Sequence, residues 1–238
     1  MLVALTLLLA HLLPVLDPGN SGGTLRPRIT PDLARLNTHL PLVALTFDDG
    51  PSPQFTPQIL ALLEAAQVPA TFFVVGREAF RSPRLVQELQ ASGFEVGNHT
   101  WNHFMTPMTT AVAAWEVHRT DRLLENLLQK HPRFFRPPGG ELNTGVAAYA
   151  QHSGETVVTW SVDPRDYTRG ISAQQIIDVV LRQVHPGSVI LMHDGGGDRS
   201  ATVEALGRLI PALRARGFTF VSLHSLCELA HCPPTPHD

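Results

Sequence analysis

Short apolar runs alternate along this chain with longer stretches in which apolar residues recur every three or four positions. The short runs are typical of buried strands, and the longer pattern is typical of amphipathic helices. Because strands that alternate with helices usually build a parallel sheet, we expect an α/β fold, a distorted or incomplete (β/α) barrel with about seven parallel strands. The predicted strands are 42–47, 70–75, 94–97, 133–136, 156–161, 188–192 and 218–223, and the predicted helices are 56–66, 83–92, 109–130, 144–153, 172–184 and 201–216.

The ends of several predicted helices carry recognisable signals. Ser172 and Ser82 precede helical stretches, where a hydroxyl can accept a hydrogen bond from a free amide of the first turn. Pro83 suits the first helical position because its ring presets the backbone angle there. Gly93 and Gly217 follow two helices and predict left-handed C-terminal caps that lead into the next strand.

The first 24 residues differ from the rest of the chain and precede the predicted domain, 25–238. An apolar run, 2–16, is followed by a turn-rich segment, 17–23, and the two together resemble a signal peptide. The positively charged residues that usually begin a signal peptide are missing, because the first basic residue is Arg26. The run is shorter than the roughly 20 apolar residues that span a bilayer. We therefore expect a protein that is secreted or held at the cell envelope, with weak membrane association through the N-terminus or a buried N-terminal helix as alternatives.

Composition narrows the class of protein further. Hydrophobic residues make up 43% and charged residues 16% of the chain, as in a globular domain, and the net charge is −3. The basic residues are scattered arginines with the single Lys130, so nucleic acid is not an expected partner. Cys227 and Cys232 are close enough in sequence for a disulfide in an oxidising compartment, but two free thiols fit the spacing equally well.

Five clusters of polar residues each follow the carboxyl end of a predicted strand. In a barrel these ends share one rim, which is where barrel enzymes build their active sites. The clusters therefore predict one site made from distant parts of the chain. They span residues 48–51, 99–103, 136–140, 163–167 and 193–195.

The first two clusters have the residue types of a metal site. Asp48 and Asp49 would repel each other, unless one binds a cation and the other stays free as a base; as an isolated motif, however, the pair also fits a simple turn. His99 and His103 are four residues apart, so a helical turn or tight loop brings both imidazoles to one side. Two histidines and one carboxylate leave open coordination positions, which suits a catalytic zinc better than a structural one.

The other clusters supply groups for acid–base chemistry. Arg136 is suited to orienting a carboxylate, and the turn after it could point a backbone amide, such as that of Gly139, at a developing oxyanion. His193 follows an apolar strand and is well placed for a general acid. Either Asp163 or Asp166 could hold its charge and tautomer, or could instead cap the helix that begins nearby.

These motifs resemble those of the polysaccharide deacetylase family, also called the NodB-homology domain. The resemblance covers about residues 41–230 and includes five motifs in order. Its most specific parts are Thr-Phe-Asp-Asp-Gly-Pro at 46–51, the His99/His103 pair, and Leu-Met-His-Asp at 191–194. It implies a hydrolase that removes acetyl groups from an N-acetylated polysaccharide such as peptidoglycan or a chitin-like N-acetylglucosamine polymer.

The resemblance also implies a role for each site residue. Asp48 would be the general base that activates water, and Asp49 with His99 and His103 would hold a divalent metal, usually zinc. His193 would protonate the leaving amine. Arg136 would hydrogen-bond the base, and the Gly139 amide would be the oxyanion donor. Asp166, more than Asp163, would pair with the acid, while Tyr167 and Leu191 would line the pocket for the acetyl methyl group.

Two positions depart from the family pattern. Gly139 stands where many members carry tyrosine, which keeps the amide donor but removes an aromatic wall of the groove. Tyr167 stands where tryptophan is usual and keeps an aromatic face. Neither change removes a catalytic group, but both alter the walls of the substrate groove. The sequence therefore does not separate an N-acetylglucosamine polymer or peptidoglycan from acetylated xylan as the substrate.

Three other functions compete with this one. A carbohydrate-binding domain without chemistry could keep the groove, although the complete ligand set argues against it. An iron-dependent oxygenase also uses two histidines and one carboxylate, but the adjacent second carboxylate disfavours it. The same fold could also hydrolyse another amide, such as a formyl group or a cyclic imide.

Overall fold

The structure is a computed structural model that describes residues 38–229. The signal-peptide-like segment 1–24 and Cys232 lie outside the described residues. Among the described helices, none combines the length and the apolar character that crossing a membrane requires.

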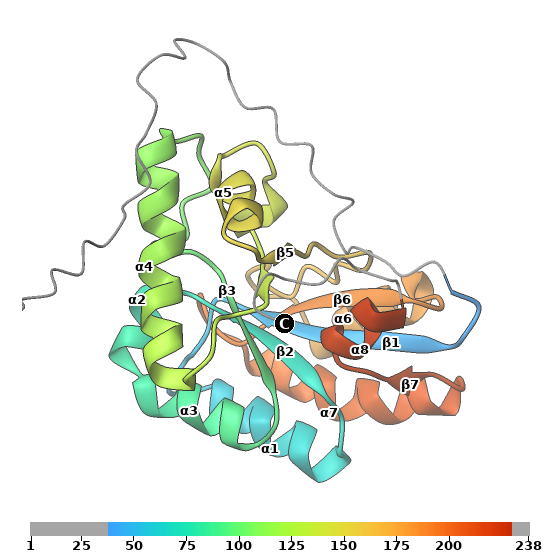
Figure 1. Cartoon of the computed structure of the whole chain (residues 1–238). Coiled ribbons are helices and arrows are strands. Elements are labelled where there is room, and N and C mark those ends of the chain that lie inside the picture. The colour runs from blue at the N-terminus through green and yellow to red at the C-terminus, as the bar shows by residue number, and fades with distance from the viewer. Residues whose placement is uncertain (1–37, 230–238) are drawn as a thin grey trace, which may run out of the picture.

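A parallel sheet forms the centre of the molecule (Figure 1). Its strands follow the order β5-β4-β3-β2-β1-β6, and β7 pairs with the start of β1. Every strand pair is parallel, as the alternation of strands and helices predicted. The strands are β1 (Leu42–Asp48), β2 (Ala70–Val74), β3 (Glu95–Asn98), β4 (Phe134–Phe135), β5 (Thr156–Val157), β6 (Ser188–His193) and β7 (Thr219–Phe220).

The segment after β5 closes part of the barrel. The sequence predicted one strand over 156–161, but only β5 pairs with β4. The amide of Val158 still donates to Phe135, whereas Ser161 donates to the carbonyl of Val189 and Leu191 donates to that of Val162. The chain therefore crosses from the β4 edge to the β6 edge, which is why one predicted strand becomes a short strand and a crossover.

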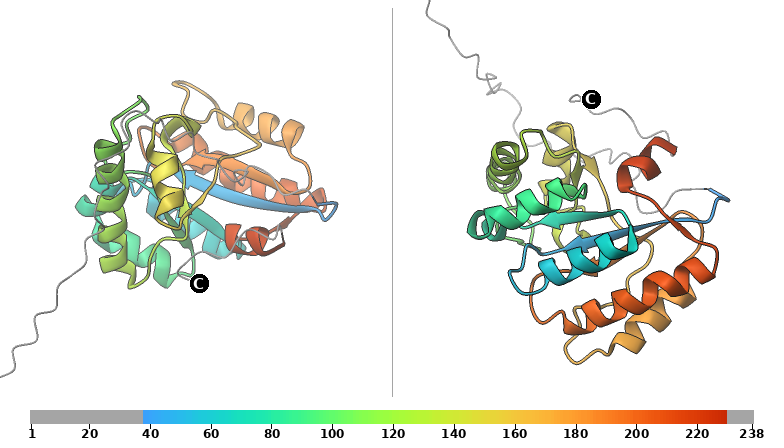
Figure 2. Two further views of the ribbon diagram at one scale, coloured as in Figure 1. Left: turned by 45° about the horizontal axis from the view of Figure 1, so that its top comes forward. Right: turned by 90° about the horizontal axis from the view of Figure 1, so that it is seen from below.

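Helices surround the sheet, and the figures show α1, α3 and α7 along one side of it and α4 and α5 at another (Figures 1 and 2). Two helices, α2 and α8, were not predicted, because each has only two turns or less and too few residues for a periodic signal. The sequence predicted a strand over 218–223, but β7 ends at Phe220 and Leu223 is the first residue of α8. The helices are α1 (Thr56–Ala66), α2 (Gly76–Arg81), α3 (Pro83–Ala91), α4 (Thr110–Leu128), α5 (Val146–His152), α6 (Ala173–Gln183), α7 (Ser200–Ala215) and α8 (Leu223–Leu229).

The helix-end predictions hold with one exception. Ser172 accepts a hydrogen bond from the Gln175 amide and forms a complete capping box. Gly93 and Gly217 have positive φ angles of 83° and 84°, as left-handed caps require. Ser82, in contrast, makes no side-chain cap bond, because it is the single residue between α2 and α3 and also ends α2.

The two faces of β1 have different neighbours. Val43, Leu45 and Phe47 face the main core, which is shared with the outer helices. Ala44 faces a second cluster on the inner side, where α8 contributes Leu223, Leu226 and Cys227. Apolar side chains of α8 therefore pack on the inner side near the start of the strands, where Glu95 also accepts from the His224 amide, and the predicted site residues lie toward the carboxyl ends. Cys227 is disulfide-bonded.

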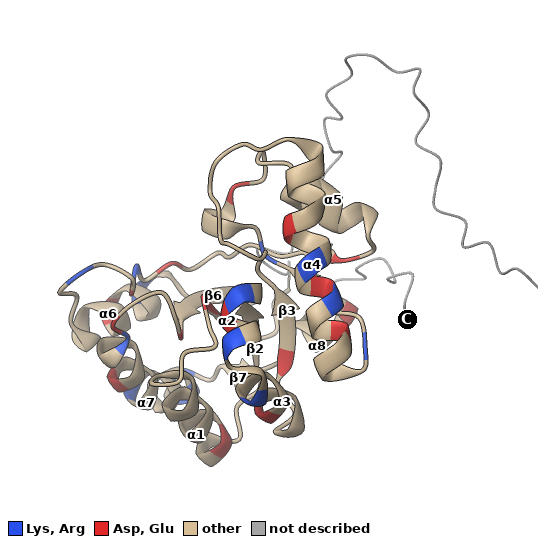
Figure 3. Cartoon of the chain, turned by 90° about the vertical axis from the view of Figure 1, so that its left-hand side faces the viewer, with Lys and Arg blue, Asp and Glu red and all other residues tan. Residues whose placement is uncertain are grey.

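Charged side chains of both signs are spread over the helices. In Figure 3 lysine and arginine alternate with aspartate and glutamate along α2, α3 and α4. The ion pairs along these helices join neighbouring residues on the surface, such as Arg81 with Glu78 and Arg122 with Glu125. Exposed pairs of this kind contribute little to stability.

Candidate functional site

The carboxyl ends of β1, β3 and β6 bring three of the predicted clusters together. In the register of the sheet Asp48 is opposite His193, and Thr46 is opposite Leu191. Because side chains alternate along a strand, these four residues face the same inner side. His99 directly follows β3, and its amide donates to the carbonyl of Val74 in β2.

Asp49, His99 and His103 form a cluster with the geometry of a metal site. Their candidate ligand atoms all lie within 4.8 Å of one another. Oδ1 of Asp49 is 3.1 Å from Nε2 of His103 and 3.6 Å from Nε2 of His99. This Oδ1 is buried and has no hydrogen-bond partner among residues 38–229. A buried, unsatisfied carboxylate oxygen beside two imidazole nitrogens fits a divalent cation.

His99 is held in the form that a metal ligand needs. Its Nδ1 lies 2.6 Å from the carbonyl oxygen of Arg136 and therefore donates to it, which leaves Nε2 free as an acceptor. Burial and the neighbouring His103 lower the pKa of His99 to about 3. The imidazole is thus neutral at ordinary pH, and its Nε2 points at the cluster.

A tight approach of two loops places Asp49. This residue has a positive φ of 72°, a conformation that aspartate tolerates better than most residues. The loop after β6 lies against it: a Cβ on Gly195 would come within 2.1 Å of the Asp49 carbonyl oxygen. Only glycine therefore fits at position 195 without displacing the backbone of Asp49.

Asp48 and Arg136 form a buried ion pair on the inner face. Nη1 of Arg136 donates to Oδ1 of Asp48 over 2.7 Å and to the hydroxyl of Thr46 over 2.8 Å. The other guanidinium nitrogens donate to the carbonyls of Val158 and Thr159, so the barrel crossover holds this arginine. Burial raises the pKa of Asp48, and the charge of Arg136 opposes that rise. The carboxylate keeps one oxygen, Oδ2, that Arg136 does not occupy.

His193 pairs with Asp166 and not with Asp163. Its Nδ1 lies 2.7 Å from Oδ1 of Asp166, whose Oδ2 accepts from the His193 amide and from the hydroxyl of Thr202. Burial alone would lower the pKa of His193, but Asp166, Asp48 and Asp49 together raise it to about 9. Asp163 is half-buried and has other partners, because it accepts from the Arg165 amide and the Tyr167 hydroxyl. The residues alone left both aspartates open, and the hydrogen bond is made by Asp166, which the family resemblance favoured.

The remaining predicted residues surround this centre. The ring of Tyr167 packs edge-on against His193 with centroids 5.2 Å apart, and 44% of the residue is exposed. Leu191 is buried on the inner face between the strands. Gly139 lies in the short 3-10 turn Pro138–Gly140 with a φ of 63°, and a Cβ there would approach Sδ of Met105 to 3.0 Å. Met105 therefore lies beside the position at which the sequence departs from the family pattern.

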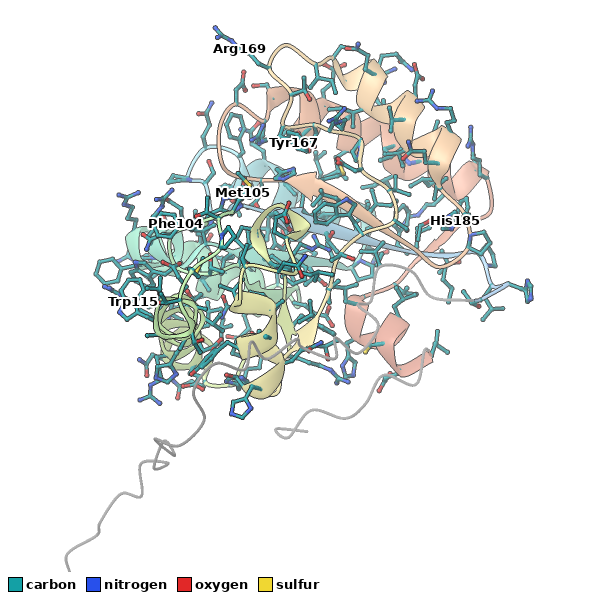
Figure 4. All side chains as sticks on the ribbon, turned by 90° about the horizontal axis from the view of Figure 1, so that it is seen from above. Phe104, Met105, Trp115, Tyr167, Arg169 and His185 are labelled. Atoms are coloured by element: carbon teal, nitrogen blue, oxygen red, sulfur yellow. The ribbon has the colours of Figure 1, made fainter. Side chains whose placement is uncertain are left out.

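Exposed apolar side chains gather beside the cluster. Five of the eight large exposed hydrophobic residues of the described chain fall within residues 80–115. We call these five side chains the apolar surface. Two of them contact the ring of Trp101 in the histidine loop, Phe80 at 6.1 Å and Trp115 at 6.3 Å between centroids. In Figure 4 Met105, Phe104 and Trp115 follow one another away from Tyr167. The apolar surface consists of Phe80, Phe104, Met105, Val112 and Trp115.

Sequence reasoning did not identify several residues that hold the site. Thr46 bonds Arg136, and Thr202 bonds Asp166, but a lone threonine in a strand or helix carries no signal of such a role. Asp194 is buried, and burial raises its pKa to about 7; its carboxylate accepts from Thr56. Glu116 carried a usable signal, because it occurs on the buried side of α4 between apolar positions.

Comparison with known proteins agrees with this geometry. The family model described as polysaccharide deacetylase matches residues 35–158. The chain is 38% identical over 202 residues to a peptidoglycan-N-acetylglucosamine deacetylase of Bacillus cereus, covering 80% of this chain and 90% of the relative. It is 43% identical over 205 residues to a chitooligosaccharide deacetylase of Sinorhizobium fredii, covering 79% and 93% respectively.

A solved structure supports the same relationship. The crystal structure of a peptidoglycan N-acetylglucosamine deacetylase in complex with 4-naphthalen-1-yl-N-oxidanyl-benzamide superposes with a TM-score of 0.77 at 37% identity. The superposition covers 81% of this chain and 91% of that one. The parallel sheet, the sequence matches and the order of the motifs therefore agree, and this chain belongs to the polysaccharide deacetylase family.

Proposed function

We propose that this protein is a metal-dependent hydrolase that removes acetyl groups from an N-acetylglucosamine polymer, peptidoglycan or a chitin-like chain. The observation that carries the proposal is the cluster of Asp49, His99 and His103, with two further groups beside it: Asp48, held by Arg136, and His193, held by Asp166. The family membership and the substrates in the names of the relatives support it. A secreted or cell-envelope location follows from the same proposal.

Asp49, His99 and His103 would hold the cation, for which zinc is our choice because two imidazoles and one carboxylate leave open positions on it. Bound there, it would polarise the acetyl carbonyl and increase the acidity of water. The chain's own groups do the rest.

Asp48 is the proposed base. Burial raises its pKa and makes it a better proton acceptor, while Arg136 keeps it ionised and fixes its orientation through Oδ1. Oδ2, which Arg136 does not bond and which lies 3.6 Å from Nε2 of His99, is then the atom that takes a proton from the attacking water. Arg136 acts in orientation and not in proton transfer, because a guanidinium stays protonated and each of its three nitrogens already donates to a group of the barrel.

His193 is the proposed acid. Because Asp166 holds Nδ1, the opposite ring nitrogen, Nε2, is the one that can donate a proton to the leaving amine. The raised pKa keeps the imidazole protonated at neutral pH. The amide of Gly139 would donate to the oxyanion, and Leu191 with Tyr167 would enclose the acetyl methyl group.

The rest of the polymer would lie on the apolar surface. Sugar rings have apolar faces that pack on exposed aromatic side chains, and Phe104 directly follows the predicted ligand His103. Met105, beside Gly139, would replace the aromatic wall that many relatives have there. Substrate choice would therefore depend on this flexible side chain.

The test measures released acetate from chitin oligomers and from peptidoglycan, with metal-stripped and zinc-restored protein. We expect zinc-dependent acetate from one of them, and a loss of about 10²- to 10⁴-fold in kcat for Asp48→Asn with zinc still bound. Wild-type turnover by Asp48→Asn would remove the assigned base. Zinc binding without acetate release from either polymer would favour another acyl substrate or a purely carbohydrate-binding role.

A further inference from the structure

The loop that carries both predicted histidine ligands has an unfavourable backbone. Thr100 and His103 have positive φ angles of 64° and 63°, although neither is glycine. A β-branched residue such as Thr100 is rarely found in this region, and such conformations persist only where surrounding contacts hold them. The loop therefore depends on bonds to other parts of the protein.

The two histidines are held to different degrees. The ring of His99 is anchored directly, because its Nδ1 bonds the Arg136 carbonyl oxygen at 2.6 Å. For His103, Nδ1 has no hydrogen-bond partner within residues 38–229, and a quarter of the side chain is exposed. Its amide donates to the hydroxyl of Thr100, a bond inside the loop. The position of His103 is thus set by the loop backbone and by Asp49.

A buried glutamate from α4 fastens that backbone. Oε2 of Glu116 accepts from the amides of Trp101 and Asn102 at 3.0 and 2.7 Å. Oε1 accepts from the side-chain amide of Asn102 at 2.6 Å. Glu116 is 1% exposed, and hydrogen bonds to an ionised carboxylate are stronger than neutral ones. All three bonds reach the loop between His99 and His103.

We infer that Glu116 is a positioning residue: by holding Trp101 and Asn102, which precede His103 in the loop, it increases the metal affinity of the site. The inference rests on the proposed metal site. Glu116 bonds neither the histidines nor Asp49, so its effect passes through the backbone of residues 101 and 102. Partners that hydrogen-bond metal ligands directly typically change affinity about 10- to 100-fold, and we expect an effect of the same order from Glu116 because it holds the backbone next to His103.

The first experiment measures the zinc affinity of the full chain by competition with a chromophoric chelator. We expect Glu116→Ala to weaken zinc about 10- to 100-fold. Glu116→Gln should lose less, because its amide oxygen can still accept from both main-chain amides. The matched control is Glu125→Gln, another hydrogen-bonded glutamate of α4 that contacts Arg122 and His131 and not the loop; its zinc affinity should equal that of the wild type.

A double-mutant cycle tests the route through His103. In a His103→Ala background, Glu116→Ala should change zinc affinity less than about threefold, whereas in a His99→Ala background the effect should remain about 10-fold or more. Equal effects in both backgrounds would overturn the inference, because a general structural role predicts them.

Further outcomes separate the inference from its premise. If the wild type binds no zinc, the proposed metal site fails. If the wild type binds zinc and Glu116→Ala binds it equally well, only the role of Glu116 fails. If thermal unfolding shows that metal-free Glu116→Ala does not fold, Glu116→Gln and Asn102→Ala decide: weaker zinc binding in both supports the inference, and unchanged binding in both overturns it.

Discussion

At the scale of single residues, each proposed catalytic group is oriented by a partner from a distant segment. Asp48 is fixed by Arg136, and His193 by Asp166, each over 2.7 Å. In Asp48 the partner bonds Oδ1, and in His193 it bonds Nδ1. The other oxygen, Oδ2, and the other ring nitrogen, Nε2, are left for the proposed proton transfers. This division explains why the identity of the partner matters as much as that of the catalytic residue.

The pH dependence of activity should report the pairing of Asp166 with His193. Removing the negative charge in Asp166→Asn destabilises the imidazolium, so the pKa of His193 should fall from its value of about 9. Since the proposed acid must be protonated, the alkaline limb of kcat should move to lower pH. Full pH profiles of kcat check this. Asp163→Asn is the control and should leave the limb in place; a shift in that variant, or none in Asp166→Asn, would contradict the assignment.

The close approach at Gly195 gives a stability prediction. A Cβ there would lie 2.1 Å from the Asp49 carbonyl oxygen, so Gly195→Ala must displace one of two loops. We expect overpacking to lower the free energy of unfolding by roughly 1–3 kcal/mol and to weaken zinc binding. Chemical denaturation and zinc titration measure the two effects.

Gly207→Ala is the matched control for that change. It lies inside α7, and a Cβ there would meet only Cδ2 of Leu62 at an ordinary 3.8 Å. Because alanine is the better helix former, this variant should be stabilised by about 0.5–1 kcal/mol with unchanged zinc affinity. Equal behaviour of the two glycine variants would refute the crowding argument.

At the scale of elements, local sequence signals predicted most helices and strands, and tertiary contacts decided the exceptions. The long strands β1 and β6 and the helices α1, α6 and α7 were predicted nearly to their ends. The short elements α2 and α8 were missed. The segment 156–161 was misread because its later residues pair with β6, a partner about thirty positions away in sequence.

Two serines test the difference between a cap signal and a cap. Ser172→Ala removes the capping box of α6 and should lower the free energy of unfolding by about 1 kcal/mol, with kcat unchanged because α6 contributes none of the proposed site residues. Ser82→Ala removes no cap bond and should cost clearly less. Denaturant unfolding of both variants checks the order. A larger loss in Ser82→Ala would show that its hydroxyl has another role.

At the scale of the whole molecule, the two ends of the barrel differ: one is filled by packed apolar side chains, and the other carries the proposed active site. The apolar residues of α8 pack on the inner side near the start of the strands, and the carboxyl ends carry the proposed acid, base and metal ligands. The apolar surface extends from the end that carries the proposed active site. A polymer bound as we propose would lie on this surface beside the reacting sugar.

Chain-length dependence of the substrate should reveal that surface. We expect Phe104→Ala to raise KM for long N-acetylglucosamine oligomers about fivefold, the equivalent of about 1 kcal/mol for one lost aromatic contact. KM for a disaccharide should stay near its wild-type value. Leu40→Ala is the control, since Leu40 is 55% exposed but precedes β1 at the opposite end of the barrel. An equal rise for short and long substrates would place Phe104 at the reacting sugar instead.

The sequence alone determined the alternation of strands and helices and the chemical identity of the site, because periodicity and residue type are local properties. It placed Asp48, Asp49, His99, His103 and His193 at strand ends, and parallel pairing then brings such ends to one rim. Only the tertiary structure decided that Thr202 also bonds Asp166, that Met105 lies beside Gly139, and that Glu116 holds the histidine loop. These are distances between segments far apart in the chain, which depend on how helices and crossovers pack against the sheet.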